Sequence, residues 1–175
     1  RQIESFAGYA FAKGHSASYA VESYQSLFLK AYYPLEYMVA TINNFGGFYS
    51  TELYVHEARM HNGTIEAPCI NTSFTQTIIK EKTIYLGFMF LQSLESKTIE
   101  RIIKDRQFHG QFSSLDDFIE RVPISIEQIS ILIKIEAFRF SGVNKRKLLW
   151  EAHLKISKTI IQENAINLFK TERIN

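Results

Sequence analysis

The chain has 175 residues, 46% of them hydrophobic and 22% charged, which suits a folded protein of one domain or two small ones. Its net charge of +2 is too small to indicate nucleic-acid binding by itself, although the basic excess lies in residues 97–175. The single cysteine, Cys69, excludes an internal disulfide and favours a reducing cytoplasm, and no apolar run reaches the ~20 residues of a membrane span.

The N-terminal third of the chain is predicted to be helical. A short helix is expected to end near Ala12, and residues 13–16 are expected to form a tight break before the next helix. Ser16 is a suitable N-cap for that second helix, which should continue to about Tyr32. Pro34 predicts a further start, because proline fits the first helical turn.

Residues 49–61 have helical spacing, and Asn62-Gly63 should stop that helix. The pattern then changes to β-branched residues. Residues 74–79 and 83–86 flank a polar turn and are predicted to form a strand pair. This change in composition makes residues 63–88 the expected seam between two units.

Short helices are predicted again over residues 89–155. Ser or Asn residues mark the expected helix starts, and one of them opens a Ser-x-x-Gln capping box. These starts are Ser96, Ser114, Ser125 and Asn144. Residues 156–175 have helical spacing and could extend the last helix or dock alone. The sequence thus predicts a mainly α fold of short helices in two units, with a small β-hairpin near the seam.

Four segments follow from this pattern: helices over 1–62, a β connector over 63–88, a helical module over 89–155 and a helical tail over 156–175. Lys13 and His15 stand at the predicted helix break, and no acidic residue lies between Glu4 and Glu22 to neutralise them. A cation, an imidazole and a helix N-terminus together suit a phosphate. The alternative is that Lys13 is solvated and His15 caps or packs.

Residues 5–38 resemble a signature, FAGYxFxKxHSxxY, in the fingers of the bacterial DNA polymerase III alpha subunit, a C-family replicative polymerase. The matching residues are Phe6, Ala7, Gly8, Tyr9, Phe11, Lys13, His15, Ser16 and Tyr19. A looser similarity continues in order to residue 155, through 67–71, 85–87 and 136–138. The resemblance implies distal fingers followed by a helix-hairpin-helix region, and it implies a fragment of a longer polypeptide.

By this resemblance, Lys13 and His15 would face the phosphates of an incoming deoxynucleotide triphosphate, and Ser16 would be a further nucleotide-binding residue. Tyr9 and Tyr19 would line the adjacent wall, with core packing as the alternative for both tyrosines. Primer-template DNA, the rest of the polymerase chain, the sliding clamp and other replisome subunits are the implied partners, with no membrane and a cytoplasmic location.

Two-metal nucleotidyl transfer requires a cluster of carboxylates. The resemblance implies Mg²⁺ in the parent polymerase, held by a palm outside this chain, so no metal site is expected here. Asp116-Asp117 is interpreted instead as a pair in the first turn of a helix, where carboxylates complement the dipole. The isolated chain is therefore predicted to lack primer-extension activity.

The helix-hairpin-helix region is the second candidate site. Where the family has Lys-Gly-Val-Gly, this chain has Gln92-Ser93-Leu94-Glu95, which predicts poor phosphate binding at that hairpin. A better DNA contact begins at Ser141 with a glycine turn and a basic run, whose alternative is a solvated basic turn. Its predicted DNA-binding residues are Asn144, Lys145, Arg146 and Lys147.

Two other functions remain open from the sequence. One is a helical nucleic-acid-binding module that uses the basic run at 145–147 and has no nucleotide role. The other is a degenerate domain that binds only protein. Salt-dependent duplex binding separates them, because phosphate contacts release counterions.

Overall fold

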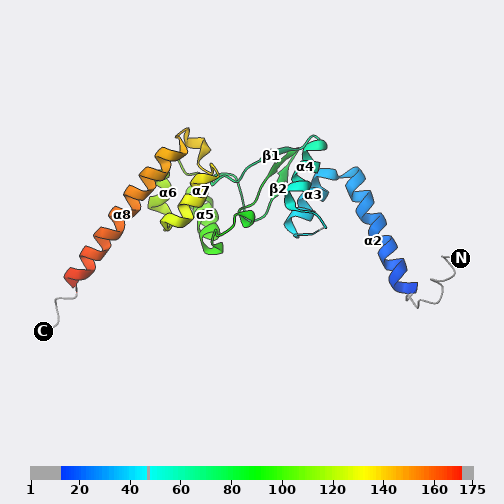
Figure 1. Cartoon of the computed structure of the whole chain (residues 1–175), viewed down its shortest axis with the longest axis horizontal. Helices are drawn as coiled ribbons and strands as arrows, with labels where there is room; N and C mark the ends of the chain where they lie inside the picture. Colours follow the sequence, from blue (N-terminus) through cyan, green and yellow to red (C-terminus); the bar gives the residue numbers. More distant parts are fainter. Residues whose placement is uncertain (1–12, 47, 171–175) are drawn as a thin grey trace. The chain divides into compact units, whose positions relative to one another are not determined.

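The computed structural model describes residues 13–46 and 48–170, with side chains described for 14–46 and 48–158. The chain divides into two compact units, Arg1–Gly63 and Thr64–Asn175. Most of the described residues are in helices, and a small three-stranded sheet belongs to the second unit (Figure 1). This confirms the mainly α fold with minor β content.

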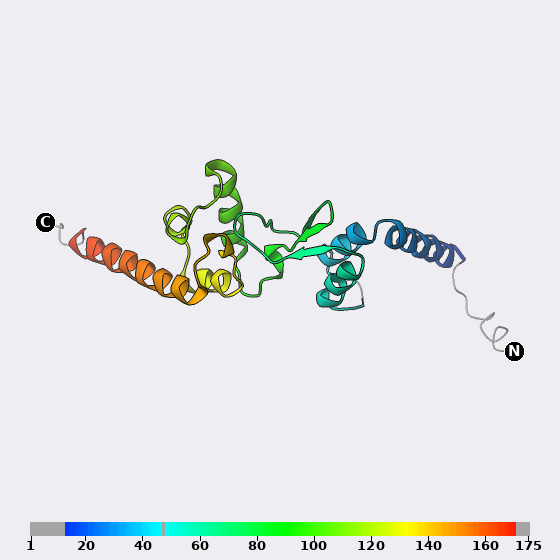
Figure 2. The ribbon, with the colours of Figure 1, turned by 90° about the horizontal axis from the view of Figure 1, so that it is seen from above.

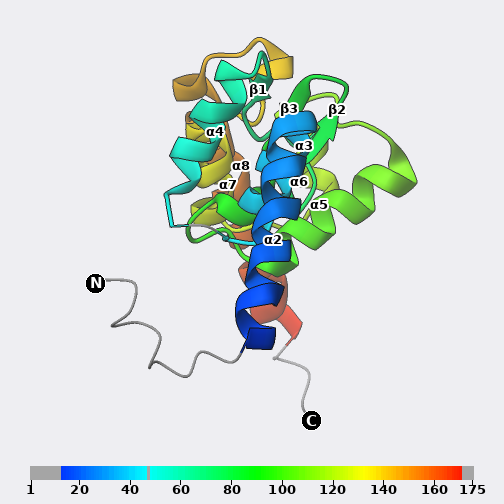
Figure 3. The same cartoon turned by 90° about the vertical axis from the view of Figure 1, so that its right-hand side faces the viewer.

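The first unit consists of α2 (Lys13–Tyr32), α3 (Pro34–Asn43) and α4 (Thr51–Met60) (Figures 1 and 3). The predicted start at Pro34 is confirmed. An ion pair of 3.1 Å between Lys30 Nζ and Glu57 Oε1 joins α2 to α4. Buried side chains of α3 and α4 form the core: Leu35, Met38, Val39, Ile42, Tyr54 and Ala58.

The predicted helix break at residues 13–16 is wrong, because Gly14, His15 and Ser16 all lie within α2. Ser16 is therefore not an N-cap. A single glycine costs a helix only about 1 kcal/mol relative to alanine, and no proline follows until Pro34, so the helical spacing outweighs the local break signal. The helix predicted to end near Ala12 lies outside the described residues.

The sheet of the second unit has the order β1-β3-β2, with β1 (Thr64–Glu66), β2 (Ile78–Lys80) and β3 (Thr83–Tyr85). The predicted strand pair is confirmed as the antiparallel β2 and β3, although both strands are shorter than expected. Residues 74 and 75 leave the ladder because their carbonyls accept from the N–H groups of residues 88 and 89. The parallel pairing of β1 with β3 was not predicted.

Helices α5 (Ser96–His109), α6 (Leu115–Arg121), α7 (Ile126–Lys134) and α8 (Lys145–Lys170) follow the sheet. Two 3₁₀ turns, η1 (Phe88–Phe90) and η2 (Arg139–Ser141), precede α5 and α8. The α8 ribbon continues without interruption from residue 145 to 170, so residues 156–170 extend the last helix (Figure 2). Edge-to-face phenylalanine contacts lie in their shared core, where Phe118 meets Phe112 at 5.0 Å and Phe138 at 5.1 Å.

The helix caps follow the sequence closely. Ser114 Oγ accepts from Asp117 N–H at 3.1 Å and caps α6. Ser125 Oγ accepts from Gln128 N–H at 3.4 Å and caps α7. These local bonds explain why the helix starts were readable from serine positions.

Long polar side chains connect residues 70–73, which lie between β1 and β2, to the helical part of the second unit. Arg106 donates to the carbonyls of Ile70 at 2.7 Å and Ser73 at 2.8 Å. Burial lowers the pKa of Arg106. Asn71 forms a two-way amide pair with the backbone of Phe112, at 2.8 and 2.9 Å. The sheet segment and the helical module are therefore parts of one folded unit.

Candidate nucleic-acid interface

Two loops of the second unit share one backbone feature, a left-handed residue two positions before a helix N-cap. The first hairpin loop (residues 92–95) precedes α5, and the second hairpin loop (residues 141–144) precedes α8. Each contains one residue with a left-handed backbone, Ser93 at φ 64° and Gly142 at φ 66°. Each then places an apolar side chain against the core, followed by the N-cap residue of the helix.

The second hairpin loop presents a glycine and a helix N-terminus to solvent. Gly142 is exposed, and no atom lies within 4 Å of the position that a Cβ would take there. Asn144 Oδ1 accepts from Arg146 N–H at 2.8 Å and so caps α8. Ser141 Oγ accepts from Val143 N–H at 3.3 Å, which fixes the turn. This arrangement offers close approach to a phosphate together with a positive helix end.

Three consecutive cations follow this loop, and all three are exposed. Lys145 Nζ lies 3.2 Å from Glu136 Oε1, and Lys147 Nζ lies 3.8 Å from Glu151 Oε1. Such exposed ion pairs are worth at most about 1 kcal/mol and are readily exchanged for a phosphate. Within the described part of the chain, no carboxylate forms an ion pair with Arg146. The predicted DNA-binding residues are thus brought together at one helix start.

A cavity of about 400 Å³ lies beside the second hairpin loop. Gly142, Asn144 and Lys145 line one part of it, and Phe138 and Leu148 line another. The loop therefore lines this recess, while its Val143 packs against the core.

The first hairpin loop is closed by a side chain from α7. Gln128 Oε1 accepts from Glu95 N–H at 2.7 Å, and Gln128 Nε2 donates to Ser93 O at 2.7 Å. The Glu95 N–H, at the helix N-terminus, is therefore already used within the protein. Glu95 also adds an exposed negative charge. Weak phosphate binding at this loop stays a prediction, and the internal use of the Glu95 N–H is the structural observation behind it.

The sequence did not reveal Gln128 as a residue that holds this loop. The capping box predicted that its side chain would reach back to Ser125, but only the Ser125 half of that box forms. The Gln128 side chain instead bonds across to the first hairpin loop, 33 residues earlier for Glu95. Nothing local in the sequence signals a pairing over that separation.

The predicted nucleotide-binding residues lie in the first unit. His15, Ser16 and Tyr19 are exposed on α2, and the rings of His15 and Tyr19 meet edge-on with centroids 4.4 Å apart. Lys13 is the first described residue of α2. Tyr9 lies outside the described residues. The structure thus brings His15 and Tyr19 together on one helix.

Asp116 and Asp117 lie in the first turn of α6, as predicted. Asp117 Oδ2 accepts from Ser113 N–H at 2.8 Å, and this bond, with help from Arg121, lowers the pKa of Asp117. Among the side chains that the structure describes, no group of three or more His, Cys, Asp or Glu is placed to hold a metal ion. Within the same residues, no helix has both the length and the apolar character needed to cross a membrane.

Comparisons with known proteins agree with this geometry. The helix-hairpin-helix motif family matches residues 62–148. The error-prone DNA polymerase of Mycobacterium tuberculosis is 29% identical over 154 residues, which cover 86% of this chain and 14% of that protein. The DNA polymerase III subunit alpha of Treponema pallidum is 31% identical over 153 residues, which cover 85% of this chain and 13% of that protein. The DNA polymerase III subunit alpha of Saccharopolyspora erythraea is 33% identical over 147 residues, which cover 82% of this chain and 12% of that protein.

The chain spans only 12–14% of the length of these relatives. The match includes both units of the chain, since 86% of it aligns with the mycobacterial protein. The chain is therefore similar to a small part of the DNA polymerase III alpha subunits and error-prone DNA polymerases of several bacteria.

Proposed function

We propose that this chain acts as part of a DNA-directed DNA polymerase of the DNA polymerase III alpha type, and that its second hairpin loop contacts duplex DNA. The observation that supports this most directly is the glycine turn at the start of α8, followed by three exposed cations. The helix-hairpin-helix match over residues 62–148 includes this loop.

The contact follows from elementary electrostatics. Backbone N–H groups in the first turn of a helix have no carbonyl one turn earlier and point outward toward an anion. The absence of a side chain at Gly142 lets the phosphate backbone approach, and the cations from Lys145 to Lys147 neutralise it. Such contacts position DNA without reading its sequence.

A nucleotide role belongs to the first unit in this proposal. In the longer polymerase, Lys13, His15 and Ser16 contact the triphosphate of the incoming nucleotide, while Tyr9 and Tyr19 line the adjacent wall. The exposure of His15 and Tyr19 supports this, since neither side chain is used in the core. In the intact polymerase, His15→Ala should lower kcat/KM for nucleotide about ten- to a hundredfold without lowering the melting temperature.

The remaining parts of the proposal concern the longer protein. Its metal is Mg²⁺, held by carboxylates outside this chain, and no metal-dependent step is assigned to the residues described here. Primer-template DNA, the rest of the polymerase chain, the sliding clamp and other replisome subunits are its partners in the cytoplasm.

The test of the duplex contact is its salt dependence. Binding of the chain to a labelled 16-base-pair duplex is measured by fluorescence anisotropy between 50 and 200 mM salt, with Lys145, Arg146 and Lys147 replaced together by alanine. The variant should bind roughly a hundredfold more weakly at low salt, and the log–log salt slope should fall by about 0.9 for each phosphate that the variant no longer neutralises.

A charge-matched control replaces three exposed lysines elsewhere, Lys80, Lys82 and Lys158, by alanine. This control should keep most of the affinity. If Ser93→Arg abolishes binding while the triple variant keeps it, DNA lies on the first hairpin loop and the assignment is wrong. If the chain binds no duplex at any salt concentration, the protein-interaction alternative is favoured.

A further inference from the structure

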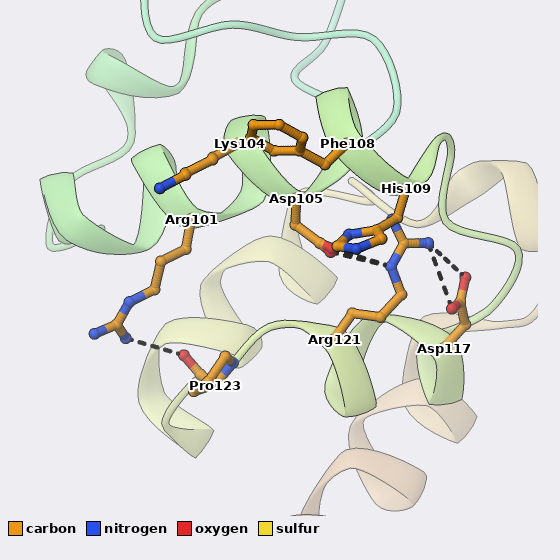
Figure 4. Close-up of a pocket in the computed structure, with 8 residues that line it drawn as sticks. All are labelled: Arg101, Lys104, Asp105, Phe108, His109, Asp117, Arg121 and Pro123. Atoms are coloured by element: carbon orange, nitrogen blue, oxygen red, sulfur yellow. Dashed lines mark hydrogen bonds and ion pairs between the residues drawn. The ribbon is translucent and has the colours of Figure 1, made fainter.

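A second surface feature lies away from both hairpin loops. A cavity of about 590 Å³ opens between α5 and α6 and the segment that follows α6 (Figure 4). The helix-hairpin-helix contact proposed above does not use it. The charges and the aromatic ring that line it suggest a ligand.

The floor of the cavity holds two carboxylates and one guanidinium that pair with one another. Arg121 Nε lies 3.1 Å from Asp105 Oδ2, and Arg121 Nη1 lies 3.2 Å from Asp117 Oδ2 (Figure 4). The guanidinium also stacks 4.2 Å from the centre of the Phe112 ring. These contacts fix Arg121 as a structural cation, and its two carboxylate partners leave the floor with a small negative charge, so an anion would have to be held at the rim.

The rim of the cavity has a different character. Phe108 is 75% exposed, and Lys104 stands one helical turn before it on the same face of α5. Within the described part of the chain, Lys104 forms no ion pair. Arg101 lies about one turn before Lys104, and its Nη1 donates to the Pro123 carbonyl at 3.2 Å. An unshielded ring therefore lies beside two cations that are open to an anion.

We infer that this cavity binds single-stranded DNA, with one base stacked on Phe108 and the adjoining phosphates held by Lys104 and Arg101. Exposed aromatic rings flanked by cations are the usual means of holding single strands, because every base has a face to stack. A duplex is a poorer occupant, since its bases are already stacked on one another. An acidic peptide satisfies the cations but not the Phe108 ring.

The length of the rim fits this occupant. Arg101 and Phe108 are seven residues apart on one helix, about 10 Å along its axis. That span holds a base and its adjoining phosphates. The site is separate from residues 145–147, so a substitution in it should leave duplex binding intact.

The first measurement compares two probes on the full 175-residue chain. Anisotropy is measured with labelled dT12 and with the 16-base-pair duplex, for the native chain and for Phe108→Ala. The substitution should weaken dT12 binding about five- to a hundredfold and leave duplex binding unchanged. Phe108→Tyr should restore dT12 binding, and Phe48→Ala, which removes another exposed phenylalanine, should leave it unchanged.

A second measurement reports stacking directly. The chain has one tryptophan, Trp150, so a Trp150→Phe, Phe108→Trp double variant carries a single indole at the rim of the cavity. Its fluorescence should be quenched by dT12, and an abasic strand of the same length and charge should quench it far less.

Three results would overturn the inference. One is dT12 binding by Phe108→Ala at native strength, and another is equal quenching by the abasic strand. The third is displacement of dT12 by an equal concentration of a 12-residue polyglutamate peptide, which would make the site a peptide surface. Each of these leaves the salt-dependent duplex contact at residues 145–147 intact, so failure here is distinct from failure of the proposed function.

Discussion

The two hairpin loops share a left-handed residue two positions before the helix N-cap, yet they have opposite chemistry. Ser93 and Gly142 differ by only 2° in φ, yet the first loop ends in a glutamate, whereas the second ends in an asparagine and is followed by three cations. The first loop is held by the Gln128 amide, whereas the second is capped by its own Asn144.

The comparison shows that a hairpin conformation does not by itself make a phosphate site. The same turn can be used to bind DNA or to bind another part of the protein, and the choice depends on where the first-turn N–H groups find their acceptors. In the first loop the acceptor is internal, so that loop stabilises the fold. In the second loop Asn144 Oδ1 accepts from Arg146 N–H, and a phosphate is the proposed acceptor for the other first-turn N–H groups.

Removing the Gln128 amide should have the largest effect. Gln128→Ala deletes two bonds of 2.7 Å and leaves the Glu95 N–H without its internal acceptor, so the free energy of unfolding should fall by about 2 kcal/mol. Urea unfolding measures this. Gln92→Ala, which changes an exposed glutamine of the same loop, is the control and should be close to neutral. Equal stability of both variants would mean that Gln128 does not hold the loop.

Substitutions at the two left-handed positions, Ser93 and Gly142, should change the free energy of unfolding in opposite directions. Ser93→Gly should raise the free energy of unfolding by about 0.5–1 kcal/mol, because glycine adopts positive φ without strain. Gly142→Ala should lower it by about 1 kcal/mol for the same reason. Thermal unfolding of the two variants measures both changes. Melting temperatures that shift in the same direction would contradict a left-handed backbone at both positions.

Removing the negative charge of the first loop should change DNA binding modestly. Glu95→Gln should strengthen duplex binding a few-fold at low salt if this loop faces the DNA alongside the second, and the gain should vanish at high salt. Glu100→Gln removes a neighbouring exposed carboxylate on α5 and is the matched control. An equal gain in both variants would show only a general effect of net charge.

The smallest effect concerns α6, which lies between the two loops in the chain. The lowered pKa of Asp117 means that its ionised form is favoured by folding, so its contribution is present above pH ~4 and is lost as the pH falls through the folded pKa. Asp117→Asn should therefore be slightly less stable than the native chain at pH 7, and the difference should be smaller at pH 2. Urea titrations at the two pH values measure this, and a stability gap that persists in acid would assign the effect to packing.

Features set by neighbouring residues were predictable. Pro34, Ser114 and Ser125 mark real helix starts, because each acts on the turn beside it. The run at 145–147 was readable as a basic helix start for the same reason. The break expected at residues 13–16 was wrong because a single glycine is a weak signal against a long helical pattern.

Features set by distant residues were not predictable. The parallel partner of β3 and the Gln128 bonds both join residues far apart in sequence, and no local pattern encodes them. The roles of the predicted nucleotide-binding residues and the four-part division of the chain stay predictions, because they depend on ligands and on a longer protein.

Arg139, the first residue of η2, bonds to the β1 segment, and this affects when that segment can fold during ribosomal synthesis of the chain. Arg139 donates to Pro68 O at 3.1 Å and Ala67 O at 2.9 Å and pairs with Glu66 at 3.0 Å, so it closes loops of about 70 residues. A ribosome adding roughly 5–20 residues per second needs several seconds to make the intervening chain. During that interval residues 66–68 have left the ribosome, but the Arg139 guanidinium that bonds to them has not yet been made. The strand segment should therefore be a target for chaperones or proteases until α7 and η2 have left the exit tunnel.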